Sequence, residues 1–159
     1  MEPIFENRIE AGKALSQRVA QSIRDRNALV LGLPRGGVPV AFEVAVALEA
    51  ELDIFIVRKL GLPGQEELAI GAIASGGVRV VNEALIAELQ LSPSLIDGIA
   101  EREQKELERR EQLFRGGRPR VPVAGRTVII VDDGIATGAS MKARITAYKV
   151  IMKVTFVLE

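Results

Sequence analysis

One apolar run that ends in two acids constrains this chain more than any other feature. Residues 127–131 read TVIIV, and Asp132 and Asp133 follow directly. β-Branched residues favour a buried strand, and the small residues of 134–140 (GIATGAS) suit a tight turn into a helix. Open α/β sheets bind ligands at the carboxyl ends of their strands. We therefore expect a parallel strand that delivers two carboxylates to a binding site.

The turn after the acids has the properties of a phosphate site. Backbone amides and a helix N-terminus attract an anion, and the hydroxyls of Thr137 and Ser140 can donate to it. Asp132 and Asp133 would repel a phosphate, so the hydroxyls of a ribose, or Mg2+, suit them better. The segment thus predicts a ribose-5-phosphate site. The alternative is an ordinary turn between a strand and a helix, whose acids only cap that helix.

The rest of the chain alternates between strand and helix patterns. We expect helices over 4–26, 38–48, 82–89, 92–115 and 139–150, strands over 28–33, 52–57, 127–131 and 151–158, and a hairpin of 68–75 with 78–81. The succession of strand, helix and strand implies parallel pairing with a right-handed crossover. The fold class is α/β, with a Rossmann-like parallel sheet flanked by helices. Residues 1–159 are predicted to form one domain, with 1–27 as an N-terminal segment and 28–159 as the core.

Local signals mark the ends of two of these helices. Asn82 and Ser92 are predicted N-caps, and Pro93 fits the first turn that follows Ser92. Within 92–115, Glu106 and Arg110 form an i,i+4 pair on what we interpret as a solvated face without chemistry.

Composition removes several classes of chemistry. The chain has no Cys and no His, which excludes thiolate nucleophiles, Cys-ligated zinc and imidazole acid–base catalysis. Lys plus Arg equals Asp plus Glu at 21 each, so no global positive charge points to nucleic acid. No apolar run approaches the roughly 18 residues of a membrane span, and no signal peptide opens the chain. The expected location is the cytoplasm.

The segment VIIVDDGIATGAS (128–140) resembles the signature with which type I phosphoribosyltransferases bind 5-phosphoribosyl 1-pyrophosphate (PRPP). The resemblance implies the type I fold, with Asp132 and Asp133 on the ribose hydroxyls, where they share Mg2+ with PRPP oxygens. It also implies that Gly134 binds PRPP and that a loop wraps the 5-phosphate, formed by Ala136, Thr137, Gly138, Ala139 and Ser140. The ending of this loop is similar to that of uracil phosphoribosyltransferases. Purine salvage members commonly carry an acid at the position of Ala136.

Two upstream sites fit the same ligand. Pro34-Arg35-Gly36-Gly37 follows a strand, where glycines permit unusual φ values and expose amides to an anion, and Arg35 adds a bidentate donor. In the family, this loop binds the pyrophosphate of PRPP. The pair Arg58-Lys59 resembles a pyrophosphate-contacting pair of orotate phosphoribosyltransferases. We expect Arg35, Lys59, Asp132 and Asp133 to carry catalysis.

Residues 60–77 fall where the family has its flexible catalytic hairpin loop. Gly61, Pro63 and Gly64 suit a segment that closes over a site. Glu66 and Glu67 would orient an acceptor or Lys59, or are simply solvated.

The resemblance covers about residues 28–141 and implies transfer of a phosphoribosyl group from PRPP to an acceptor, for which a nucleobase is one candidate, with release of pyrophosphate. The chain stops one strand after the helix that follows the signature, so we expect either a truncated protein or a partner that completes it, and a homodimer is typical of the family. Two alternatives stay open. One is a non-catalytic regulatory module that binds PRPP or a nucleotide. The other is an unrelated α/β nucleotide-binding domain, although no phosphate-loop Lys is present.

Overall fold

The computed structural model describes residues 5–133 of the 159-residue chain. These residues form two compact units, one of residues 5–55 with 118–133 and the other of residues 56–117, and each is described by itself. The expected helix over 139–150 and the expected strand over 151–158 lie outside the described residues.

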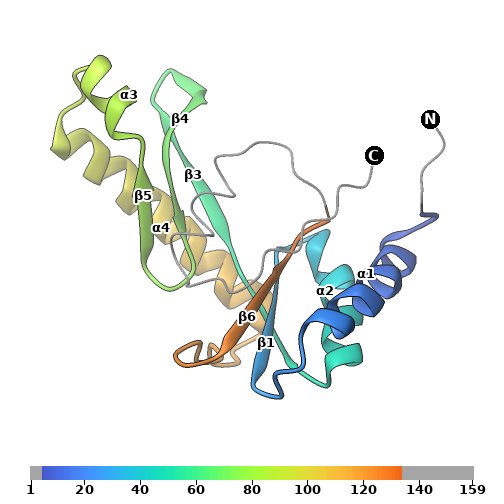
Figure 1. Ribbon diagram of the computed structural model, residues 1–159. Helices are drawn as coiled ribbons and strands as arrows, with labels where there is room; N and C mark the ends of the chain where they lie inside the picture. Colours follow the sequence, from blue (N-terminus) through green and yellow to red (C-terminus); the bar gives the residue numbers. More distant parts are fainter. Residues whose placement is uncertain (1–4, 134–159) are drawn as a thin grey trace. The chain divides into compact units, whose positions relative to one another are not determined.

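The first unit is built on a parallel sheet of three strands in the order β2-β1-β6 (Figure 1). The central strand β1 (Ala28–Gly32) pairs with β2 (Glu51–Ile54) on one side and with β6 (Thr127–Val131) on the other. Helix α2 (Gly37–Leu48) connects β1 to β2. This arrangement confirms the predicted strand–helix–strand unit and the α/β fold class.

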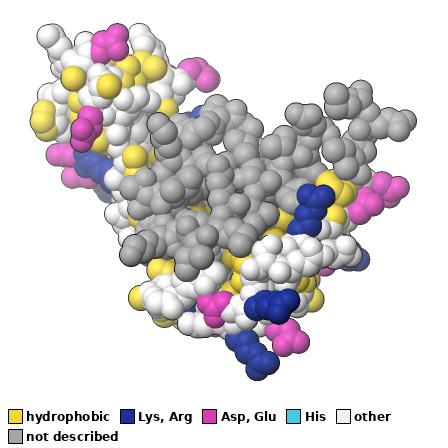
Figure 2. All heavy atoms as spheres, in the orientation of Figure 1, with side chains coloured by type: hydrophobic (Ala, Val, Ile, Leu, Met, Phe, Trp, Pro, Cys, Tyr) yellow, Lys and Arg dark blue, Asp and Glu magenta, His cyan; other side chains and the backbone are white. Residues whose placement is uncertain are grey.

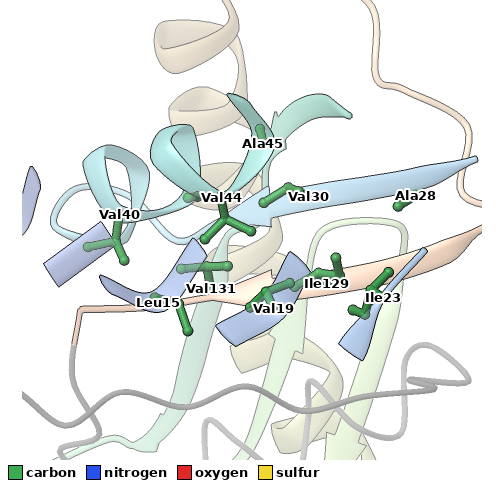
Figure 3. Packing of buried hydrophobic residues seen from close by; sticks show 11 residues of the cluster. Leu15, Val19, Ile23, Ala28, Val30, Val40, Val44, Ala45, Ile129 and Val131 are labelled. Carbon is green, nitrogen blue, oxygen red and sulfur yellow. The ribbon is translucent and has the colours of Figure 1, made fainter. Parts of the chain in front are cut away.

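The core of this unit lies between the sheet and two helices. Helix α1 (Arg8–Ser22) contributes Leu15 and Val19, which meet Val40 and Val44 of α2 (Figure 3). The strands add the buried residues Ala28, Val30, Ile129 and Val131. The two helices approach closely at Gly12, where an added Cβ would lie 2.9 Å from the Cβ of Glu43. The position of α1 on α2 is therefore fixed by tight packing.

A single arginine joins the amino ends of the three strands. Arg126, just before β6, donates from Nε to the carbonyl of Asn27 (3.1 Å) and from Nη2 to that of Ala28 (3.0 Å). Its Nη1 lies 2.5 Å from Oε2 of Glu51, the first residue of β2. The side chain of Arg126 is 13% exposed and that of Glu51 is 63% exposed, so the guanidinium is shielded while its acid partner faces solvent.

The second unit is an antiparallel sheet with a long helix. Strands β3 (Val57–Leu62), β4 (Gln65–Ala74) and β5 (Val78–Val81) pair in that order, and α3 (Glu83–Glu88) follows them. Helix α4 (Pro93–Arg115) packs against β3 and β4 (Figure 1). Its buried apolar side chains are those of Ile96, Ile99, Ala100 and Leu107. The paired β4 and β5 confirm the hairpin predicted around Gly76-Gly77.

The structure confirms both predicted N-caps. The side chain of Asn82 accepts a hydrogen bond from the backbone of Leu85, and the hydroxyl of Ser92 accepts one from the backbone of Leu95. Glu106 pairs with Arg110 at 3.0 Å, as the i,i+4 spacing predicts.

Two predicted elements differ from the structure. The run 52–57 is not one strand, because β2 ends at Ile54 and β3 begins at Val57 in a different sheet. The backbone N–H of Phe55 still donates to Gly32 of β1, whereas that of Ile56 donates to the hydroxyl of Ser75. The helix predicted over 4–26 is shorter in the structure, where α1 begins at Arg8 and ends at Ser22.

The described surface carries both signs of charge. Figure 2 shows basic and acidic side chains interspersed on the visible face. Within residues 5–133, no helix is long and apolar enough to cross a membrane.

Candidate functional site

The carboxyl ends of β1 and β6 place two of the predicted site segments side by side. Gly32, the last residue of β1, is in register with Val131, the last residue of β6. Beyond them, the backbone N–H of Leu33 donates to the carbonyl of Val131 at 3.0 Å. The loop that begins at Pro34 and the acids that begin at Asp132 therefore leave the sheet at the same edge.

Gly36 and Gly37 allow the loop after β1 to lie close to the residues at the end of β6. Gly36 has φ −66° and ψ −29°, and Gly37 is the first residue of α2, so neither uses the unusual φ values that the sequence suggested. A Cβ on Gly36 would lie 2.0 Å from Oδ2 of Asp133, and one on Gly37 would lie 2.8 Å from the carbonyl oxygen of Val131. At Gly37 a side chain would collide with the backbone at the end of β6, whereas at Gly36 it would displace the side chain of Asp133.

The loop also presents hydrogen-bond donors. The N–H of Gly37 is already donated to Leu33 at 2.9 Å, and that of Val38 to Arg35 at 3.3 Å. Among the described residues, the backbone N–H groups of Arg35 and Gly36 have no acceptor. The N-terminus of α2 has no side-chain cap, and the side chain of Arg35 is exposed. These groups form a positively polarised end of the loop that suits an anion.

The two acids differ in their surroundings. Oδ1 of Asp132 accepts the backbone N–H of Asp133 at 2.9 Å. Oδ2 of Asp133 accepts a hydrogen bond from Nε of Arg8 at 2.9 Å, and Nη2 of Arg8 forms an ion pair with it at 2.8 Å. The side chain of Asp133 is 28% exposed. Arg8 thus belongs to the site, and nothing in its local sequence indicated this.

Arg58 and Lys59 belong to the second unit, where both lie inside β3 and not at a strand end. Arg58 donates from Nε (2.8 Å) and Nη2 (2.6 Å) to Oε2 of Glu103 on α4. Leu60, two residues after Arg58, is fully buried, whereas Lys59 is exposed. Because side chains alternate along a strand, Lys59 projects from the face opposite to Arg58.

The remaining predicted residues are of two kinds. Glu66 and Glu67 are exposed on β4, and their role stays a prediction. The others lie outside the described residues: Gly134, predicted to bind PRPP, and the predicted 5-phosphate loop of Ala136, Thr137, Gly138, Ala139 and Ser140.

The acids offer hard oxygen ligands of the kind that Mg2+ prefers. Within residues 5–133, no group of three or more acidic side chains has the spacing of a metal site. Asp132 and Asp133 alone supply too few ligands for a protein-only site. The pair fits a Mg2+ ion that takes most of its ligands from a bound substrate and water.

A parallel sheet with a glycine loop and an acid pair at its carboxyl edge defines a Rossmann-like α/β domain. The family model of the phosphoribosyl transferase domain matches residues 4–149, and the chain therefore belongs to this family.

Related proteins agree with the family. Two curated Mycobacterium tuberculosis proteins, one from each of two strains, are provisionally named phosphoribosyl transferases. Each is 52% identical to this chain over 140 residues, or 88% of it. That match spans 31% of each relative, so the chain corresponds to about a third of their length. The crystal structure of TT1426 from Thermus thermophilus superposes with a TM-score of 0.78, at 39% identity over 96% of this chain and 74% of that one.

Proposed function

We propose that this chain is a phosphoribosyltransferase that binds PRPP with Mg2+ and transfers the phosphoribosyl group to an acceptor. The observation that carries the proposal is the contact between the loop after β1 and the acids after β6. The absent side chain of Gly36 admits the carboxylate of Asp133, so donors for an anion adjoin acceptors for hydroxyls. PRPP presents both partners in one molecule, a ribose with vicinal hydroxyls and a pyrophosphate on its anomeric carbon.

Each part of the site has a role in this proposal. Asp132 and Asp133 accept hydrogen bonds from the ribose hydroxyls. Arg35 and the N–H of Gly36 bind the pyrophosphate, together with Lys59 and Arg58 as the family resemblance implies. The segment from Ala136 to Ser140 binds the 5-phosphate.

The reaction breaks the bond between the anomeric carbon and the pyrophosphate oxygen, and forms one between that carbon and the acceptor. No protein nucleophile is required, which agrees with a chain that lacks Cys and His. Negative charge develops on the departing pyrophosphate, and Arg35 with the loop amide stabilises it. Asp132 and Asp133 would hold Mg2+, which would supply further positive charge to the departing pyrophosphate.

The test is to incubate the protein with PRPP, Mg2+ and, one at a time, uracil, orotate, hypoxanthine, xanthine, guanine and adenine, and to measure pyrophosphate release. Release with one base establishes the transferase and identifies its acceptor. Calorimetric binding of PRPP without release from any base favours the regulatory module. Absence of PRPP binding contradicts the proposal.

A further inference from the structure

We infer that Arg8 is a positioning residue of the sugar site, which orients the carboxylate of Asp133 for the ribose hydroxyls. The inference rests on the proposed function and adds a residue from the N-terminal helix to it. Arg8 and Asp133 are 125 positions apart in the sequence, yet Nε of Arg8 donates a hydrogen bond to Oδ2, and Nη2 forms an ion pair with the same oxygen.

The fold fixes the place from which Arg8 reaches the acid. Helix α1 begins at Arg8, and the side chain of Asn7 caps it by accepting the N–H of Glu10 at 2.9 Å. Further along, Leu15 is fully buried, and Gly12 allows α1 to lie tightly on α2. The base of the Arg8 side chain is therefore held at the edge where β6 ends.

The positive charge of Arg8 does not stabilise helix α1. A cation at the first position of a helix opposes the macrodipole, which favours acids at this end. Glu10 meets that preference in the same turn, and Arg8 does not. The contact with Asp133 gives a physical reason for a basic residue at this position.

The carboxylate of Asp133 is confined on two sides. Gly36 lies so close that a Cβ there would overlap Oδ2, and Arg8 binds the same oxygen. Among the described residues, Oδ1 accepts no hydrogen bond and is available to a ribose hydroxyl.

The exposure of Arg8 limits how much PRPP affinity its removal should cost. The side chain of Arg8 is 55% exposed, so solvent screens the ion pair and limits its contribution. We expect Arg8→Ala to weaken PRPP binding about fivefold. Arg8→Lys, which keeps the charge but loses the planar guanidinium and its Nε donor, should fall between the wild type and Arg8→Ala.

The experiment is a calorimetric titration of the full chain with PRPP, ribose 5-phosphate and pyrophosphate, each with Mg2+. The matched control is Lys13→Ala, which removes one positive charge from an exposed position of the same helix. Arg8→Ala should weaken the two sugar-containing ligands and leave pyrophosphate unchanged, whereas a general loss of structure would weaken all three. In an Asp133→Asn background, Arg8→Ala should have no further effect.

Three outcomes overturn the inference. Affinities of Arg8→Ala equal to those of Lys13→Ala show that Arg8 has no role. Tighter binding shows that Arg8 competes with the sugar. An equal loss of PRPP affinity on Arg8→Ala in the wild-type and Asp133→Asn backgrounds shows that Arg8 does not act through Asp133. A wild-type chain that does not bind PRPP refutes the proposed function itself, and the inference with it.

Discussion

Arg58 and Glu103 join strand β3 to helix α4 through two short hydrogen bonds to one carboxylate oxygen. The side chains are 25% and 19% exposed, so this pair is better shielded than an ordinary surface ion pair. Arg58 was predicted as a pyrophosphate contact, and the structure shows its guanidinium bound within its own unit. Lys59, beside it, projects from the opposite face of the strand.

Exchanging the charges of Arg58 and Glu103 distinguishes a role of Arg58 in stability from a role in PRPP binding. Arg58→Glu and Glu103→Arg should each destabilise the chain by about 1–3 kcal/mol, because each leaves like charges together in a partly buried place. The double variant should regain at least half of that loss, which denaturant unfolding would measure. A double variant no more stable than either single variant would contradict the pairing. PRPP affinity that stays low in a restored double variant would show that Arg58 also contacts the ligand.

The two loop glycines should respond differently to alanine. At Gly37 the added Cβ meets backbone, at 2.8 Å from the oxygen of Val131 and 3.0 Å from the Cα of Asp132. That collision cannot be relieved by a rotamer change, so Gly37→Ala should cost about 1–3 kcal/mol in unfolding free energy. At Gly36 the obstacle is the side chain of Asp133, which can turn away.

Gly36→Ala should therefore disturb ligand binding more than stability. The displaced Asp133 leaves Arg8 and the ribose position, so PRPP affinity should fall while the unfolding free energy changes less than for Gly37→Ala. The two measurements are thermal unfolding and calorimetry of the same samples. A Gly36→Ala variant with wild-type PRPP affinity would contradict the close approach of Asp133 to this loop.

Removal of Arg35 tests the leaving-group role. Loss of one donor to a developing oxyanion typically costs on the order of 3–4 kcal/mol of barrier. Arg35→Ala should therefore slow pyrophosphate release roughly a hundredfold or more. Arg24→Ala, at an exposed position before β1, is the control for loss of one arginine. Equal rates in the two variants would exclude Arg35 from catalysis.

Helix α4 should show an acid-dependent contribution at Glu106. Hydrogen bonds from Arg109 and Arg110 lower the pKa of this carboxyl from 4.5 to about 2. Because the folded pKa is lowered, its stabilising contribution is present above pH 4.5 and is lost as the pH falls toward 2. Wild type and Glu106→Gln should thus differ in unfolding temperature above pH 4.5 and converge near pH 2. The effect is small because the group is exposed, and NMR titration of the carboxyl is the direct measurement.

The elements that could be predicted from the sequence have local signals. The β-branched run of β6, and the caps at Asn82 and Ser92, depend on neighbouring residues alone. The division of 52–57 has no such signal, because Phe55 and Ile56 are both buried and no Gly or Pro marks the change of sheet. Residues 60–67, which contain the end of β3 and the start of β4, were assigned to a loop because Gly61, Pro63 and Gly64 lie among them.

For the site, the sequence supplied the loop and the acids, and their order along the chain implied a common edge of the sheet. It did not supply Arg8 or Glu103, because each acts on a residue 45 or more positions away. Only the packing of whole helices brings such pairs together.

The clamp of Arg126 has a consequence for how this sheet tolerates change. It fastens the three strands at the edge remote from Asp133, with contacts to two main-chain carbonyls and one acid. The amino rim of the sheet thus has a side-chain fastening of its own, in addition to the pairing along the strands. Substitutions in the loops at the carboxyl rim therefore leave these contacts of Arg126 in place.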